Sequence, residues 1–130
     1  MSDKLFKTGI LSDTEIAELF NAKIINASEK LTNDQIQPAS LDLRLGRKAW
    51  RVRSSFLPGS KNKVKNKISR LSMHEIDLSK GAVLEKGCVY IAEIMENLDL
   101  PENISASANP KSSTGRLDIF TRLIADNTTE

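Results

Sequence analysis

The sequence is poor in the side chains on which many catalytic and metal sites depend. It contains one cysteine, Cys88, and one histidine, His74, in 130 residues. One cysteine can form no disulfide within the chain, and these two side chains cannot provide the ligand set of a zinc site. Serine–histidine and cysteine–histidine catalytic arrangements would both depend on His74. We therefore expect no zinc, a reducing cytoplasmic environment, a surface or turn position for His74, and a buried thiol without an activating neighbour at Cys88.

Long hydrophobic runs are also absent. No stretch approaches the ~20 apolar residues that cross a bilayer, and the polar start of the chain differs from a signal peptide. A hydrophobic fraction of 39% is enough for a modest core. These features predict a soluble protein without a membrane partner, built as a single domain over residues 1–130.

Acidic residues are missing from one part of the chain. The whole sequence has 19 basic and 17 acidic residues, but residues 47–70 hold nine cations and no acid. Pro58 and Gly59 indicate a loop there, so we interpret residues 47–70 as a solvated basic loop or insertion, or as a rim that attracts an anionic nucleotide. Trp50 and Phe56 are interleaved with these cations, so the stretch could also bind nucleic acid through phosphate contacts, an alternative that we favour less. The cations are Arg47, Lys48, Arg51, Arg53, Lys61, Lys63, Lys65, Lys67 and Arg70.

The first predicted element is a short helix. Ser12 is placed to cap it, and Glu15 three residues later completes a capping-box pattern. Ile16, Leu19 and Phe20 follow at helical spacing. One face of this helix is therefore expected to pack on the core.

Apolar and polar residues then alternate with the period of a β-strand. In residues 40–46 we assign the leucines to the core and expect Gly46 to end the strand. Asp42 and Arg44 fall on the polar face, where they are expected to form an ion pair or anchor a turn, and to support a subunit interface.

Further strands are predicted for residues 88–95, the most fully buried of them, and for residues 104–109 and 117–124. The pattern indicates a mainly β barrel or sandwich that starts with a helix. Because residues 117–124 lie so close to the end of the sequence, the last strand would leave an open edge. Either a partner covers that edge or the domain is truncated at its C-terminus, and we favour truncation.

One segment combines several groups that bind phosphate. Residues 109–116 offer two cations, three hydroxyls, a glycine and a proline, which together resemble phosphate-binding loops, although an ordinary solvent loop has the same composition. The groups concerned are Pro110, Lys111, Ser112, Ser113, Thr114, Gly115 and Arg116.

Two stretches of the sequence resemble the deoxycytidine triphosphate (dCTP) deaminase family, which shares its fold with the trimeric dUTPases. Residues 110–117 resemble the family's Arg-Ser-Ser-x-x-Arg motif, and residues 35–46 resemble its upstream Asp-x-Arg-Leu-Gly signature. Residues 9–16 and the turn at residues 98–101 also fit, in the same order along the chain. The resemblance therefore extends over nearly the whole sequence.

The resemblance implies a distorted dUTPase-like β-barrel, a homotrimer and active sites at the subunit interfaces. The implied reaction is hydrolytic deamination of dCTP to dUTP, with Mg²⁺ carried on the triphosphate and no zinc. A carboxylate would then have to act as the general base.

The resemblance also assigns roles to residues. It makes Ser112 and Arg116 catalytic: the serine handles protons and places water, and the arginine steadies the reacting end and the phosphates. Lys111 stands where the family commonly has arginine, so it keeps the charge but loses the planar fork. The remaining substrate-binding residues implied are Ser113, Thr114, Gly115, Leu123 and Ala125.

The family's catalytic glutamate has no match in this sequence, because it belongs to a later strand. We expect the 130-residue chain to be inactive by itself. Two alternatives stay open: a dUTPase-like hydrolase of the same fold, and a non-catalytic relative that only binds, with residues 47–70 as a nucleic-acid contact.

Overall fold

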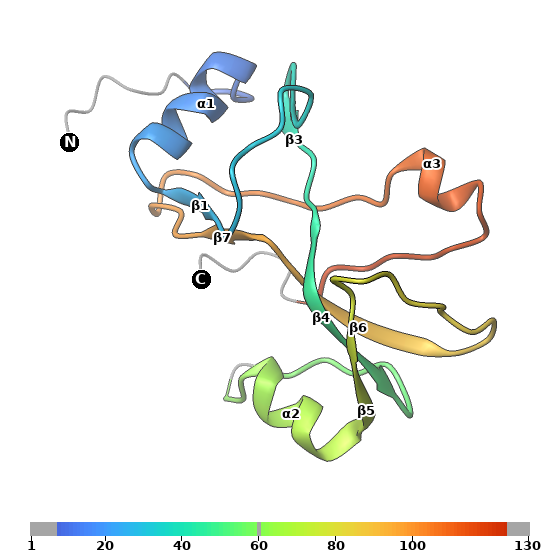
Figure 1. The fold of residues 1–130 in the computed structure, drawn as a ribbon. Coiled ribbons are helices and arrows are strands. Elements are labelled where there is room, and N and C mark those ends of the chain that lie inside the picture. The colour runs from blue at the N-terminus through green and yellow to red at the C-terminus, as the bar shows by residue number, and fades with distance from the viewer. Residues whose placement is uncertain (1–7, 60, 125–130) are drawn as a thin grey trace.

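The computed structural model describes residues 8–59 and 61–124, which form a mainly β structure with three short helices (Figure 1). Strands lie in three small antiparallel sheets, with no closed barrel among the described residues. In the same residues no helix is long and apolar enough to cross a membrane. The elements are α1 (Asp13–Asn21), β1 (Ile25–Ala27), β2 (Ile36–Gln37), β3 (Ser40–Leu41), β4 (Leu45–Val52), α2 (Val64–Leu71), β5 (Ser72–Asp77), β6 (Val89–Ile94), β7 (Glu96–Leu98) and α3 (Ser112–Gly115).

Helix α1 begins as predicted from its capping box. The Ser12 hydroxyl accepts the backbone N–H of Glu15, and the Glu15 carboxylate accepts the backbone N–H of Ser12 at 2.8 Å. These reciprocal bonds satisfy donors that have no partner inside the first turn of a helix. Ile16 and Leu19 are buried, which confirms that one face of the helix packs on the core.

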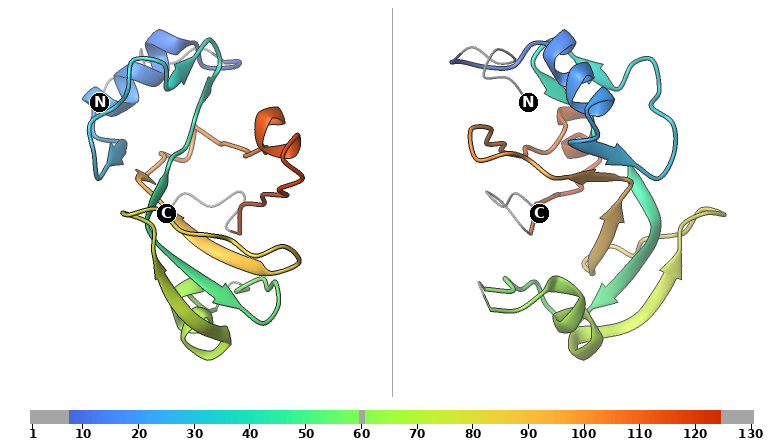
Figure 2. Two further views of the ribbon diagram at one scale, coloured as in Figure 1. Left: turned by 45° about the vertical axis from the view of Figure 1, so that its right-hand side comes forward. Right: turned by 90° about the vertical axis from the view of Figure 1, so that its left-hand side faces the viewer.

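The largest sheet has the order β5–β4–β6. Trp50 in the central strand lies opposite Glu75 of β5 and Ile91 of β6. Ala49 and Val52 on β4 are buried, as is Ile68 on α2, which packs against this strand. Helix α2 and this sheet lie at one end of the molecule and α1 at the other (Figures 1 and 2).

Two short strand pairs build the rest of the framework. β1 pairs with β7, with Ile25 opposite Leu98, and β2 forms a hairpin with β3. The first pair joins segments from the beginning and the later part of the chain. It thereby places Glu96, at the start of β7, beside the connection that precedes β4.

The prediction of one continuous strand at residues 40–46 is wrong. Strand β3 stops at Leu41. The Asp42 N–H still donates to Gln35 O, which extends the hairpin by one bond, but the Arg44 N–H donates to the Glu96 carboxylate instead of to a neighbouring strand. Gly46 does not end a strand but lies inside β4. The leucines were assigned to the core, yet Leu45 is 59% exposed in the chain.

Gly46 is needed for the close approach of β4 and β6. A Cβ atom built on it would lie 2.7 Å from Glu93 Cγ and 3.3 Å from the Glu93 carbonyl oxygen. We expect Gly46→Ala to lower the free energy of unfolding by about 1–3 kcal/mol, the usual cost of overpacking. Urea unfolding would measure the loss. Gly115→Ala is the matched control, because nothing lies within 4 Å of the added methyl. Equal stability of the two variants would contradict this explanation.

Of the three other predicted strands, one is present in the structure and two are not. Residues 88–95 do contain a strand, β6, although its end residues Val89 and Ile94 are exposed rather than fully buried. Residues 104–109 and 117–124 are not strands in the described structure, since no neighbouring strand accepts their backbone bonds. The N–H groups of Leu117 and Ile119 donate instead to Thr114 O in the turns after α3.

The interpretation of residues 47–70 as a loop is also wrong in part. Its first six residues belong to β4, and Val64–Leu71 form α2. Only the described residues between these two elements form the solvated loop. Apolar residues within the basic stretch, such as Val52 and Ile68, were the signal for ordered elements, because both are buried.

Candidate functional site

The segment at residues 111–116 forms a short helix on the surface. Lys111 precedes α3, its carbonyl accepts the N–H groups of Thr114 and Gly115, and the Arg116 N–H donates to Ser112 O. Ser112, Ser113 and Arg116 are exposed. The helix stands apart from α1 and α2 (Figures 1 and 2). The hydroxyl and guanidinium groups of this segment are thus presented to solvent.

An ion pair joins the two sequence motifs. Lys111 Nζ lies 2.6 Å from Asp42 Oδ2, although the residues are 69 positions apart in the chain. Asp42 is fixed further by Gln37 Nε2 at 3.4 Å and by its own N–H, which donates to Gln35 O. The pair is partly exposed, with 58% of the lysine and 26% of the aspartate side chain accessible. Both motifs therefore belong to one region of the surface.

Lys111 and Arg116, both predicted to act on the substrate, have different charge partners in the structure. The Lys111 ammonium group neutralises Asp42, whereas it was predicted to bind substrate. Arg116 makes no ion pair with a described residue, so its guanidinium is the unneutralised charge of the segment. Lys111 is thus paired with a carboxylate of the chain, and Arg116 is not paired among the described residues.

A buried carboxylate organises the residues behind this surface. The Glu96 side chain is fully inaccessible, and Oε1 accepts Gln35 Nε2 at 2.6 Å and Arg44 Nε at 2.9 Å. Oε2 accepts the backbone N–H of Arg44 at 2.9 Å. The guanidinium of Arg44 also donates to the carbonyls of Glu29 and Lys30. The network ties four chain segments together.

The hydrogen bonds decide the ionisation of Glu96. Burial alone would raise the pKa of its carboxyl, but the bonds from the Arg44 backbone and side chain and from Gln35 outweigh burial and hold the pKa below its ordinary value. The expected Asp42–Arg44 pair does not form: Arg44 pairs with Glu96, and Asp42 pairs with Lys111. Alternation placed both on one face, but it could not identify partners from distant strands.

Sequence reasoning missed Glu96. The only available signal was a carboxylate at the end of the mostly apolar run that includes β6. Glu93 three residues earlier gives the same signal and is exposed. The strand pairing of β7 with β1, not the local pattern, selects Glu96 for burial.

Of the last two predicted substrate contacts, Leu123 and Ala125, the structure describes only Leu123. Leu123 lies in a non-strand segment and makes no hydrogen bond to residues 111–116 among the described residues. Ala125 lies outside the described residues. Thr114 is half-buried, and Gly115 has ordinary helical geometry with open space beside it.

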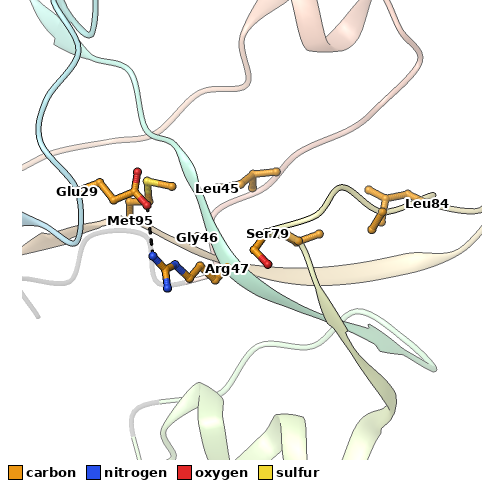
Figure 3. Close-up of a pocket in the computed structure, with 9 residues that line it drawn as sticks. Glu29, Leu45, Gly46, Arg47, Ser79, Leu84 and Met95 are labelled. Carbon is orange, nitrogen blue, oxygen red and sulfur yellow. Dashed lines mark ion pairs between the residues drawn. The ribbon is translucent and has the colours of Figure 1, made fainter.

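The structure contains a pocket of about 700 Å³ (Figure 3). Glu29 and Arg47, 3.6 Å apart, stand at one side of it, and Leu84 stands at the other. Its remaining lining residues are mainly apolar and come from β4, the loop after β5, and Met95. None of the predicted site residues lines this pocket.

The expectations for His74 and Cys88 can be compared with their positions in the structure. His74 is exposed on β5, which confirms a surface position. Cys88 is half-buried, and contrary to expectation a carboxylate is nearby: its Sγ accepts Arg51 Nη2 at 3.1 Å and donates to Glu85 Oε2 at 3.6 Å. Across residues 8–59 and 61–124, no group of three histidine, cysteine, aspartate or glutamate side chains is arranged to hold a metal ion.

Comparison with known proteins identifies the two joined motifs. Residues 7–130 match the N-terminal domain of 2'-deoxycytidine 5'-triphosphate deaminase. The chain belongs to the dCTP deaminase family. A dCTP deaminase of Haemophilus ducreyi is 30% identical over 122 residues, which cover 88% of this chain and 63% of that protein. A dUMP-forming dCTP deaminase of Nanoarchaeum equitans is 32% identical over 128 residues, covering 85% and 62%.

A solved structure shows the same fold. The dCTP deaminase of Agrobacterium tumefaciens superposes with a TM-score of 0.87 at 60% identity, over 94% of this chain and 37% of that one. The family resemblance of the motifs is thus confirmed, as is the mainly β dUTPase-like fold class. This chain spans less than two thirds of each of these dCTP deaminases.

Proposed function

We propose that this chain provides the motif-bearing part of an enzyme that hydrolyses dCTP to dUTP and ammonia. The observation that carries the proposal is the Lys111–Asp42 ion pair, which joins the two motifs of the dCTP deaminase family in one surface region. In this reaction water adds its oxygen to C4 of the cytosine ring, and the bond from C4 to the amino nitrogen breaks. One proton of the water leaves with ammonia and the other remains on N3 of the product.

The exposed groups of the α3 segment suit the polar end of such a substrate. Ser112 is proposed to place the attacking water and pass its proton, and Arg116 to stabilise charge that develops at the reacting end and on the phosphates. Ser113, Thr114 and Gly115 would contact phosphate oxygens. Lys111 acts through Asp42 and is a positioning residue, whereas backbone carbonyls near Leu123 and Ala125 would face the base.

Mg²⁺ fits this scheme as part of the substrate. In proteins it is held by carboxylates, substrate phosphates and waters. Asp42 is already engaged by Lys111, so the donors that α3 offers are hydroxyls and a guanidinium, which suit phosphate rather than a bare cation. We propose that the triphosphate carries the ion and that zinc takes no part.

The proposed enzyme acts as a homotrimer with sites between subunits. Supporting this, large apolar side chains next to α3 are exposed in the single chain, with Leu117 at 71% and Phe120 at 91%. Apolar exposure of this kind next to a polar site is typical of a surface that a second chain covers.

The 130-residue chain is proposed to lack deaminase activity by itself. Both carboxylates that the motifs bring together are engaged, Asp42 by Lys111 and Glu96 by Arg44 and Gln35. Neither is free to take a proton from water, so we infer that neither of these two carboxylates is the general base.

A chimera tests the function. The matched segment of the Agrobacterium deaminase is replaced by this chain, and conversion of dCTP is followed by chromatography, which separates dUTP from dUMP. We expect activity within about tenfold of the Agrobacterium enzyme, and no product above background from the 130-residue chain. A folded but inactive chimera would refute the deaminase assignment, and turnover by the short chain would refute its proposed inactivity. The product formed separates the deaminase from a hydrolase that continues to dUMP.

A further inference from the structure

The nine cations of residues 47–70 fall into two groups in the structure. The three on β4 are neutralised by carboxylates. Arg47 pairs with Glu29 at 3.6 Å, Lys48 with Glu75 at 2.9 Å, and Arg51 with Glu85 at 2.9 Å. These three cations are thus accounted for by the packing of the sheet and its loops.

The other six cations make no ion pair with any residue in the described part of the chain. Five are exposed and Lys67 is half-buried. They lie on α2 and the loop before it, at the end of the molecule away from α1 and α3 (Figure 2). We name this set the basic face: Arg53, Lys61, Lys63, Lys65, Lys67 and Arg70.

Helix α2 presents donors on its outer side. Val64, Ile68 and Leu71 recur at helical spacing, Ile68 is buried, and the helix packs on β4. The side away from this apolar stripe is polar. A shallow hollow of about 300 Å³ lies there, and the residues that line it are Asn62, Asn66, Lys67, Ser69 and Arg70.

These features select the kind of partner. A helix that lies in a membrane surface inserts its apolar side chains into lipid, but the apolar side of α2 packs against the sheet. Cations with amide and hydroxyl donors are the groups that contact phosphate in nucleic-acid complexes. The six side chains of the basic face are all cations. The two aromatic residues of the stretch are less available, because the Trp50 indole N–H donates to Glu75 on the sheet and Phe56 is half-buried. The face therefore offers phosphate contacts rather than a row of aromatic rings for base stacking.

We propose that the basic face binds the phosphodiester backbone of nucleic acid, independently of base sequence. The surface is separate from the α3 segment, so binding does not require the deaminase reaction. Backbone contacts of this kind release counterions and weaken as salt rises. If all six cations contact phosphates, the logarithm of affinity should fall with the logarithm of salt concentration with a slope of about −5 for duplex DNA and about −4 for a single strand.

The test is fluorescence anisotropy of labelled 20-nucleotide duplex DNA, single-stranded DNA and RNA, each in two unrelated sequences, from 50 to 200 mM salt. The 130-residue chain is compared with K63Q/K67Q/R70Q and with a charge-matched control, K30Q/K80Q/K86Q, which removes exposed lysines outside the basic face. Circular dichroism verifies that both variants fold. We expect the first variant to bind at least tenfold more weakly at 50 mM salt with a slope smaller by about 2–3, and the control to bind as the parent does.

Several results would overturn the proposal. They are no binding at 50 mM salt, equal losses in both variants, a strong dependence on base sequence, or displacement by micromolar dCTP, which would assign the binding to a nucleotide site. Equal affinity and salt slope for poly-glutamate or anionic vesicles would show a general polyanion surface instead. The proposal is supported if the parent chain and the control variant bind nucleic acid and K63Q/K67Q/R70Q does not.

Discussion

Glu96→Ala is expected to lower the free energy of unfolding by about 3–5 kcal/mol, because it leaves a charged partner without its carboxylate. The Glu96 side chain is inaccessible and accepts three hydrogen bonds, two from Arg44 and one from Gln35. Removing it leaves the buried Gln35 amide, the Arg44 backbone N–H and Arg44 Nε without their acceptor, although the Arg44 guanidinium keeps its bonds to the Glu29 and Lys30 carbonyls. Urea unfolding monitored by circular dichroism measures the loss.

Glu93→Ala is the matched control, because Glu93 lies three residues earlier and is exposed. The free energy of unfolding of Glu93→Ala should stay within about 0.5 kcal/mol of that of the parent. Glu96→Gln keeps the shape and part of the hydrogen bonding but removes the charge, so its stability should lie between those of the parent and Glu96→Ala. A Glu96→Ala variant as stable as Glu93→Ala would show that the network does not hold the fold together.

The same carboxylate predicts how stability depends on pH. The folded pKa of Glu96 is held below the ordinary value of 4.5, so the unfolded chain takes up the proton first as pH falls. Its contribution is complete above pH 4.5 and is lost as pH falls through the lower folded pKa. Unfolding free energies of the parent and Glu96→Ala should therefore converge on acidification. A difference that stays constant down to pH 2 would contradict the charged form of Glu96.

Ser112→Ala and Arg116→Ala, made in the active chimera, are each expected to lower kcat by about 10²–10³-fold. The serine would no longer place water and move its proton, and the arginine would no longer stabilise charge that forms in the transition state. Both side chains are exposed, so neither substitution should change the unfolding midpoint. Kinetics with dCTP at saturation measure the effect.

Ser54→Ala and Lys80→Ala are the controls, because they remove a hydroxyl and a cationic side chain from exposed residues outside the α3 segment. Both variants should keep full activity. Lys111→Ala distinguishes positioning from catalysis. If Lys111 acts through Asp42 as proposed, Asp42→Asn should reproduce its effect and the double variant should add little. Full activity of both Ser112→Ala and Arg116→Ala would exclude the α3 segment from the active site.

The spacing of apolar, polar and capping residues along the sequence predicted the features that depend on residues close to each other in the chain. The capping box of Ser12 and Glu15, the buried side of α1 and the β6 strand all depend on contacts within a few positions of the chain. The two family motifs also were identified from short stretches, and the comparisons confirm the family. Pattern failed for residues 104–109 and 117–124, because alternation becomes a strand only where a neighbouring strand accepts its hydrogen bonds.

The sequence by itself determined the family, the mainly β character and the place of the motif at residues 110–117, since each is encoded in short runs of residues, but the helix α3 within that motif was expected to be a loop. Only the tertiary structure decided which charges are paired. It joins Lys111 to Asp42, buries Glu96 beneath Arg44, and pairs the cations of β4 with carboxylates, whereas those of α2 form no ion pair within the described part of the chain. The scarcity of cysteine and histidine excluded whole classes of site, but the partners of the remaining charges come from strands distant in sequence, and no local pattern contains that information.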